Sequence, residues 1–391
     1  MENQSLNTEL LLASEQGDLS AIEHLLKQGA SLNYKDAEGR TALMAATQKN
    51  QVAAVKMLIE AGSDVNTRDI TQLSPFICSA ANGFHEILRL MIAGGADLPS
   101  VNRFGGTALL PSSEKGYLKT VQICIDAGVP VNHVNNLGWS ALLEAVILGN
   151  GGRLYADIIQ TLVDAGADVN LPDRDGKSSS QHAKELNQHK VVKILNKEFK
   201  ETNESIMKAK SLAKNDHYEE AIAEINKALE TDGQNLDLIY YKGYFLQELK
   251  KYAEAIQEYE KALALDPKDL DFYFYTANCY RLWKKPEEAL MEYEKACGLN
   301  PSDTFYRYHK SNYLRELGRH KEAVIEMDKL LALQHHRYDF SFHKANSLRS
   351  LGKHEEAIEA IENAIANDPT NPLYQLHKEQ SIELLEKDKR R

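Results

Sequence analysis

Residues 289–296 read ALMEYEKA, and this spacing of two alanines recurs through the second half of the chain. The first alanine returns at a constant interval, at Ala221, Ala255, Ala289, Ala323 and Ala357. Seven residues later the chain has Ala228, Ala262, Ala296, Leu330 and Ala364. Twelve residues before each first alanine lies another small residue, namely Ala209, Gly243, Ala277, Ser311 and Ala345. A period of about 34 residues is typical of stacked helix–turn–helix repeats, because small residues are needed where helices touch closely.

Large apolar residues lie between the small ones at helical spacing, among them Leu246, Tyr259, Tyr280, Tyr293, Leu314 and Leu348. With this pattern, residues 202–371 resemble the tetratricopeptide repeat family. The resemblance implies five helical repeats over 204–371. Residues 372–391 are expected to form a capping helix and tail, because the exposed end of a repeat array needs a polar outer face.

A second period governs the first half of the chain. Glycines recur at another constant interval, at Gly29, Gly62, Gly95 and Gly128, and Gly166 follows after a longer one. Glycine here predicts the left-handed C-cap of a helix. A turn follows each glycine, and then a hydroxyl residue that can cap the next helix, as in Thr41-Ala42-Leu43, Ser74-Pro75-Phe76, Thr107-Ala108-Leu109 and Ser140-Ala141-Leu142.

Paired helices with a projecting turn, at a period of about 33 residues, resemble the ankyrin repeat family over residues 4–198. The resemblance implies about six repeats, including the end caps. The phrases at 102–106 and 135–139, NRFGG and NNLGW, are similar to those of a bacterial group of ankyrin proteins. The family's usual Thr-Pro-Leu-His reads Thr-Ala-Leu-Met at residues 41–44, so the hydrogen bonds that this histidine makes between repeats are not expected.

The predicted fold is therefore all-α, with two consecutive α-solenoids. A short junction over 199–203 has no Pro, Gly or serine run, and we expect it to be fairly stiff. One ankyrin repeat is longer than the others, because Gly149 and Gly166 lie five positions farther apart than the corresponding Gly116 and Gly128. Insertions in repeats map to loops that often bind partners. The insert is either a neutral surface loop or a binding loop whose candidate contacts are Asn150, Arg153 and Tyr155.

The first helix of each tetratricopeptide repeat carries a stripe at steps of three and four residues, which in this family lines the concave groove. Its candidate binding residues are Tyr240, Tyr244, Phe274, Asn278, Arg281, Tyr308, Asn312, Arg315, Phe342, Asn346 and Arg349. Asparagine amides can pair with a peptide backbone, and arginine with carboxylates. Residues 301–350 hold nine Lys/Arg against six Asp/Glu, which favours an acidic peptide. The alternative is that the aromatic residues only pack and the arginines only face solvent.

A net charge of −11 argues against a broad basic surface for nucleic acid or an anionic membrane. Neither an apolar run long enough to span a membrane nor a secretory leader pattern is present. The four cysteines never form a C-x-x-C pair, and buried free thiols in the cytoplasm are the expected outcome.

Motifs for nucleophile elbows, phosphate loops, dinucleotide binding or zinc are absent, and the adjacent His335 and His336 do not predict a metal site. We therefore expect no enzyme activity, cofactor, metal or small-molecule substrate. The sequence predicts an adapter whose ankyrin surface binds one protein and whose groove holds an extended acidic peptide. Two alternatives stay open: a bacterial effector that uses the same repeats on host proteins, and an enzyme with its site in the inserted loop.

Overall fold

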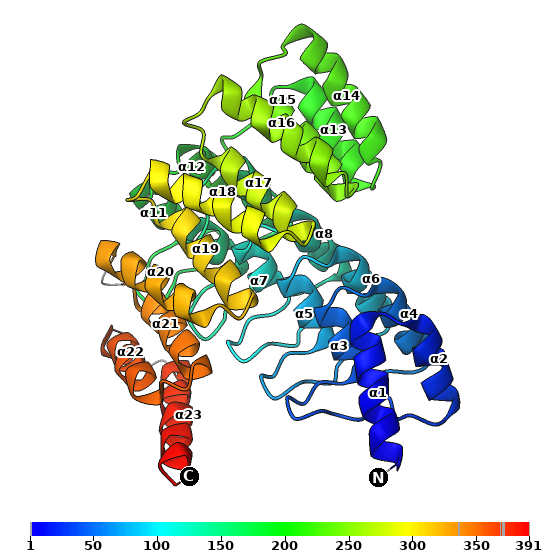
Figure 1. Cartoon of the computed structure of the whole chain (residues 1–391). Helices are drawn as coiled ribbons and strands as arrows, with labels where there is room; N and C mark the ends of the chain where they lie inside the picture. Colours follow the sequence, from blue (N-terminus) through cyan, green and yellow to red (C-terminus); the bar gives the residue numbers. More distant parts are fainter. Residues whose placement is uncertain (1, 335–336, 368, 370–371, 391) are drawn as a thin grey trace. The chain divides into compact units, whose positions relative to one another are not determined.

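A computed structural model describes residues 2–334, 337–367, 369 and 372–390 (Figure 1). The described residues form 23 helices and no strand, which confirms the predicted all-α class. The chain divides into unit 1, residues 1–198, and unit 2, residues 199–391. No helix among the described residues has the length and apolar character that a membrane crossing requires.

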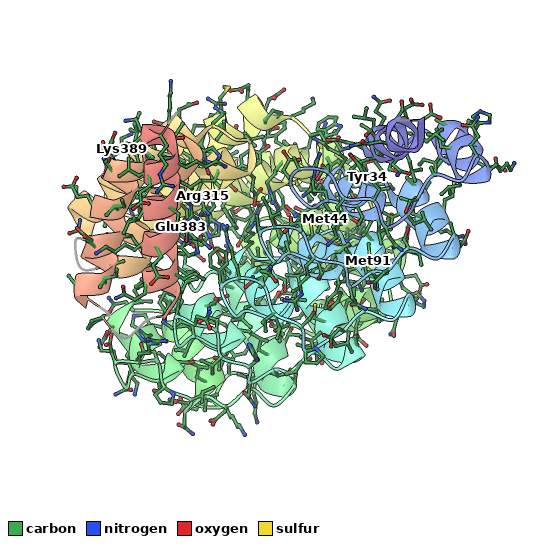
Figure 2. All side chains as sticks on the ribbon, turned by 90° about the horizontal axis from the view of Figure 1, so that it is seen from below. Tyr34, Met44, Met91, Arg315, Glu383 and Lys389 are labelled. Atoms are coloured by element: carbon green, nitrogen blue, oxygen red, sulfur yellow. The ribbon has the colours of Figure 1, made fainter. Side chains whose placement is uncertain are left out.

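Unit 1 is a stack of short helix pairs joined by long projecting turns (Figure 1). Each odd-numbered helix packs on the next odd-numbered helix, and each even-numbered helix on the next even-numbered one. Core side chains such as Met44 and Met91 are buried (Figure 2). The helices are α1 (Glu2–Gln16), α2 (Leu19–Lys27), α3 (Ala42–Gln48), α4 (Val52–Glu60), α5 (Pro75–Ala81), α6 (His85–Ala93), α7 (Leu109–Glu114), α8 (Leu118–Ala127), α9 (Ala141–Ile147), α10 (Arg153–Asp164), α11 (Ser179–Glu185) and α12 (His189–Leu195).

Hydroxyl caps begin most of the first helices of unit 1. The side chains of Thr41, Ser74 and Ser140 each accept a hydrogen bond from the backbone N–H three residues later. The predicted cap at Thr107 is wrong, because α7 begins after Ala108 and has no side-chain cap. Pro111 explains the difference, since it has no N–H to donate to the carbonyl of residue 107 in a first helical turn.

Asparagine side chains tie neighbouring ankyrin repeats together where the usual histidine is missing. Asn66 Nδ2 donates to the Gly95 carbonyl at 3.1 Å, and Asn66 Oδ1 accepts from the Asp97 backbone N–H at 2.8 Å. Asn132 makes the same two bonds with the next repeat, at residues 166 and 168. The hydrogen bonds between repeats are therefore present, but they come from another position of the repeat.

Unit 2 is a second stack of antiparallel helix pairs, in which each helix packs on the next along the chain. The alanines that mark the period are completely buried, with exposed fractions of 0% at Ala221, Ala255, Ala289, Ala323 and Ala357. Gly243, the small residue that precedes Ala255 in the repeat, shows why that position is small, because a Cβ there would lie 2.3 Å from the Tyr259 ring. The helices are α13 (Glu204–Lys214), α14 (Tyr218–Thr231), α15 (Leu236–Glu248), α16 (Tyr252–Leu265), α17 (Asp271–Leu282), α18 (Pro286–Leu299), α19 (Thr304–Glu316), α20 (His320–Leu333), α21 (Tyr338–Ser350), α22 (His354–Asn367) and α23 (Pro372–Lys389).

The four cysteines are free and buried, as predicted. Burial raises the pKa of the Cys78 and Cys124 thiols to about 12, so these thiols stay protonated at neutral pH. His335 and His336 lie outside the described residues. So does residue 371, the predicted end of the tetratricopeptide repeats.

Candidate peptide-binding groove

The candidate stripe lies on α15, α17, α19 and α21, the first helices of four successive repeats. Its aromatic row is buried, with exposed fractions of 1% to 2% at Tyr240, Phe274, Tyr308 and Phe342. Each ring packs against a ring of the next repeat or, for Phe342, of the capping helix α23. The centroid distances are 4.8, 5.0, 5.9 and 4.9 Å in the pairs Tyr240–Tyr275, Phe274–His309, Tyr308–His343 and Phe342–His377.

This packing corrects the expectation that the four rings contact a ligand. They join one repeat to the next, and their burial leaves no face for a peptide. Tyr244 is also buried and packs against Phe245, with ring centroids 5.8 Å apart. The partly exposed members of the stripe are therefore Asn278 and the three arginines, whereas Asn312 and Asn346 are buried.

Arginine side chains orient two of the three asparagines. Arg315 Nη1 donates to Asn312 Oδ1 at 3.1 Å (Arg315 is labelled in Figure 2), and Arg349 Nη2 donates to Asn346 Oδ1 at 2.9 Å. Asn312 and Asn346 have exposed fractions of 7% and 6%. Asn278 is half-buried, and its Oδ1 accepts from the Tyr293 hydroxyl at 3.4 Å. Within the described part of the chain, Asn346 Nδ2 is buried and has no hydrogen-bond partner.

Each arginine of the stripe also reaches the first helix of the following repeat. Arg281 forms an ion pair with Glu316 at 3.6 Å. Arg315 Nη1 lies 3.0 Å from His343 Nδ1, and since arginine can only donate, the imidazole accepts through that nitrogen. Arg349 Nη1 donates to Gln380 Oε1 at 3.1 Å.

Two residues of this network, His343 and Gln380, are missing from the predicted site. Gln380 occupies the position of the capping helix that corresponds to Asn346, so extending the period into that helix would have found it. His343 occupies the position after the aromatic row, where Tyr275 and His309 also lie. Its contact with Arg315 depends on how the two helices pack, and no sequence signal gives that.

The inserted ankyrin loop is shorter in the structure than the sequence suggested. Arg153 begins α10, so part of the insert extends that helix. Asn150 Oδ1 accepts from the Gly152 backbone N–H at 3.0 Å. Tyr155 has an exposed fraction of 1%, and its hydroxyl donates to the Glu114 carbonyl at 2.7 Å. Tyr155 therefore joins two repeats, and the expectation that it contacts a partner is corrected.

Family models match both units. A model described as ankyrin repeats (3 copies) matches residues 2–69 and 76–173. A tetratricopeptide repeat model matches residues 206–269 and 308–372. Residues 258–329 match a model described as anaphase-promoting complex, cyclosome, subunit 3. No curated protein matches the chain.

The solved structures that are similar to this chain each match about half of its length. An ankyrin repeat domain from Acinetobacter baumannii AYE is 48% identical, with 48% of this chain and 96% of that chain covered and a TM-score of 0.48. A second ankyrin repeat protein is 33% identical, with 49% and 97% covered and a TM-score of 0.47. A complex of a predatory endopeptidase from Bdellovibrio bacteriovorus with an immunity protein contains a chain that is 25% identical, with 49% and 98% covered and a TM-score of 0.43.

The chain belongs to the ankyrin repeat family through its N-terminal part and carries tetratricopeptide repeats in its C-terminal part. Repeats of both kinds are generally protein-interaction modules and are typically not catalytic. The resemblance that the two periods indicated is thereby confirmed.

Proposed function

We propose that this protein is a non-enzymatic adapter, in which unit 1 binds one protein and the stripe of unit 2 binds an extended acidic peptide. The observation that carries the proposal is the row of half-buried arginines Arg281, Arg315 and Arg349, which occupy the same position in three successive repeats. Arg349 also fixes the amide of the buried Asn346 by donating to its oxygen. Partly exposed guanidinium groups in a row suit a ligand that carries several acidic groups.

The ligand chemistry follows from the two rows. Amide groups at Asn278, Asn312 and Asn346 suit a peptide backbone, because a backbone offers donors and acceptors at regular intervals. The guanidinium groups of Arg281, Arg315 and Arg349 suit acidic side chains. We expect proteins or peptides as partners rather than nucleic acid or small molecules, since the net charge is −11. Four unpaired cysteines favour the cytoplasm as the compartment.

Two repeat units on one chain make the bridging of two partners the economical use, because linked binding sites raise the effective concentration of one partner near the other. The test is capture of partners with the full chain from its native cell, followed by titration of the recovered peptides. We expect peptides with acidic residues, and Asn346→Ala should weaken all of them to a similar extent. Recovery of no peptide whose binding responds to Asn346→Ala would contradict the groove assignment. Recovery of host proteins would favour the effector alternative.

A further inference from the structure

A cleft of about 310 Å³ lies between α14 and α16, the second helices of the first two repeats of unit 2. Leu246 of α15 is buried and Ile222 of α14 is half-buried, and these two side chains form the apolar part of the cleft. Leu246 is not a member of the stripe of candidate binding residues. The cleft is therefore a separate feature from the proposed peptide groove.

The charged lining of the cleft is acidic overall, with three glutamates and two lysines. Glu219 of α14 and Glu254 of α16 are exposed, and neither has an ion-pair partner among the described residues. Lys242 does not neutralise them, because it pairs with Glu258 at 3.0 Å. Lys251, which precedes α16, forms no ion pair in the part of the chain that the structure describes. Two carboxylates of the cleft are thus left without a paired cation.

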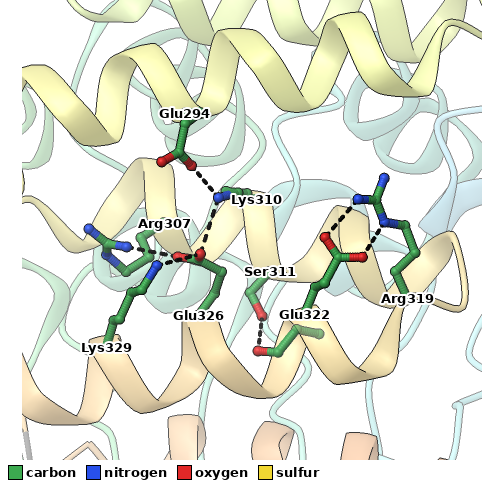
Figure 3. A network of polar contacts seen from close by, with 9 residues as sticks. Glu294, Arg307, Lys310, Ser311, Arg319, Glu322, Glu326 and Lys329 are labelled. Carbon is green, nitrogen blue, oxygen red and sulfur yellow. Dashed lines mark hydrogen bonds and ion pairs between the residues drawn. The ribbon is translucent and has the colours of Figure 1, made fainter.

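The same three positions are filled differently two repeat periods later. The residues that correspond to Glu219, Lys251 and Glu254 are Glu287, Arg319 and Glu322. Arg319 Nη1 donates to Glu287 Oε1 at 2.8 Å. Its Nε and Nη2 donate to the two oxygens of Glu322 at 2.6 and 2.7 Å (Figure 3). One guanidinium therefore joins two glutamates on the second helices of neighbouring repeats.

The first two repeats keep both glutamates but have lysine in place of this arginine. A guanidinium has five N–H donors in one plane and can serve two carboxylates at once, whereas an ammonium is a compact point charge. Lys251 accordingly leaves the cleft open. The repeat between the two cases lacks the glutamate pair, because Ala253 occupies the position of Glu219 there. Its lysine, Lys285, lies over the Trp283 ring instead, 3.7 Å from the centroid.

We propose that the cleft between α14 and α16 binds an arginine side chain of a partner protein. The guanidinium lies between Glu219 and Glu254, and the methylene groups of the arginine lie against Ile222 and Leu246. This second interaction surface goes beyond the acidic peptide assigned to the stripe and does not depend on it. The internal equivalent, Arg319 between its two glutamates, supplies the chemistry.

The surroundings of the cleft fit a cationic partner. Residues 201–300 hold thirteen Lys/Arg against twenty Asp/Glu, which attracts positive charge to this part of unit 2. The exposed amides of Asn226 and Gln257 also line the cleft. Because amide groups can pair with a peptide backbone, an arginine within a polypeptide fits better than the free amino acid.

The test titrates N-acetyl-arginine amide into the full chain and follows the backbone amides of α14 and α16 by NMR. We expect a saturable shift, and the neutral citrulline analogue should bind about tenfold more weakly. Glu254→Gln should weaken the binding of the arginine compound by about fivefold. The matched control is Glu220→Gln, which removes the exposed carboxylate next to Glu219, one that pairs with His217 at 3.6 Å, and should leave binding unchanged.

A second variant supplies the guanidinium from within the protein. Lys251→Arg should reproduce the contacts of Arg319, fill the cleft and weaken binding of the arginine compound by about tenfold. Asn346→Ala, which tests the stripe, should leave this binding unchanged. Equal binding of the arginine and citrulline compounds, or full binding by both Glu254→Gln and Lys251→Arg, would overturn the proposal. Tighter binding of free L-arginine than of the blocked compound would overturn the assignment to a partner protein.

Discussion

Lys310 Nζ lies 3.1 Å from Glu326 Oε1, so that a cation of α19 meets a carboxylate of α20 within one repeat (Figure 3). Lys310 also contacts Glu294 of the preceding repeat, and Glu326 accepts from Arg307 at 2.7 Å and Lys329 at 2.9 Å. The same pairing recurs in the first two repeats, as Lys208–Glu224 at 2.6 Å and Lys242–Glu258 at 3.0 Å. The lysine–glutamate pair thus fixes the register of the two helices in three of the five repeats.

Glu326 should be the most sensitive member of this network. It has an exposed fraction of 4%, and removing its charge leaves Arg307 and Lys310 beside each other without an anion between them. We expect Glu326→Ala to lower the free energy of unfolding by about 2–4 kcal/mol, measured by urea denaturation. The control Glu322→Ala removes a more exposed carboxylate that pairs with Arg319 and should cost less than about 1 kcal/mol. Equal costs would show that the network does not stabilise the repeat.

The same residue predicts a loss of stability in acid. Burial opposes the ionisation of Glu326, but hydrogen bonds and charges from Lys329, Lys310 and Arg307 outweigh it, so its pKa lies below the ordinary 4.5. A lowered folded-state pKa contributes stability that is complete above the unfolded-state pKa and is lost as pH falls through the folded one. Stability measured below pH 4.5 should therefore fall less steeply in Glu326→Gln than in the wild type.

At the buried alanines of the repeats, we expect a larger side chain to lower stability. Ala289 is completely buried between helices, so Ala289→Leu should overpack the contact and cost about 1–3 kcal/mol. Glu287 lies two residues earlier, is largely exposed and pairs with Arg319 at 2.8 Å. Glu287→Leu should cost less than about 1 kcal/mol. Similar denaturation midpoints for the two variants would contradict the assigned register.

For Glu144 of α9, in unit 1, we expect stability to depend on pH in the opposite direction. It has an exposed fraction of 5%; Asn135 Nδ2 donates to its Oε1 at 2.8 Å, and its buried Oε2 has no partner in the described part of the chain. Burial, with a smaller contribution from Glu114, raises its pKa well above the ordinary value. Because the folded state favours the protonated acid, this contribution to stability is complete below the unfolded-state pKa and is lost as pH rises towards the folded one.

Glu144→Gln should therefore raise stability at pH 8 by about 1–2 kcal/mol, because the neutral amide keeps the acceptor for Asn135 and is free of the stability loss that deprotonation of the unfolded chain causes. At pH 4, near or below the ordinary 4.5, the variant and the wild type should be alike. Thermal unfolding at the two pH values measures the difference, with the exposed Glu60→Gln as control. A variant that is less stable at pH 8 would show that the carboxylate is ionised and satisfied in the fold.

The repeat frame could be predicted from the sequence because close contacts accept few residue types. Ala289 and the small residues aligned with Gly243 recur in register because these helix contacts leave little room, and Gly128 marks a helix end because its φ of 94° disfavours other residues. The candidate site was predicted less well. Helical spacing placed Tyr308 and Asn312 on one stripe, but whether a ring is covered depends on the next repeat. Arg349 has no ion-pair partner among the described residues. This too depends on which side chains lie opposite it, and the packing of the helices determines that.

Peptide contacts made by asparagine and by arginine in the groove should differ in how their strength depends on salt. Asn312→Ala should weaken all peptides that bind the stripe by a similar factor and leave the salt dependence unchanged, because a backbone contact carries no charge. The variant should also lower the free energy of unfolding by about 1 kcal/mol, since Asn312 is buried and Arg315 loses an acceptor.

Arg349→Gln should weaken acidic peptides most and flatten the salt dependence, because attraction between exposed charges is screened over about 8 Å at physiological ionic strength. Calorimetric titrations at low and high salt, with Lys353→Gln as the charge-matched control, measure both effects. Unchanged affinity in both variants would remove the peptide groove and leave partner binding to unit 1.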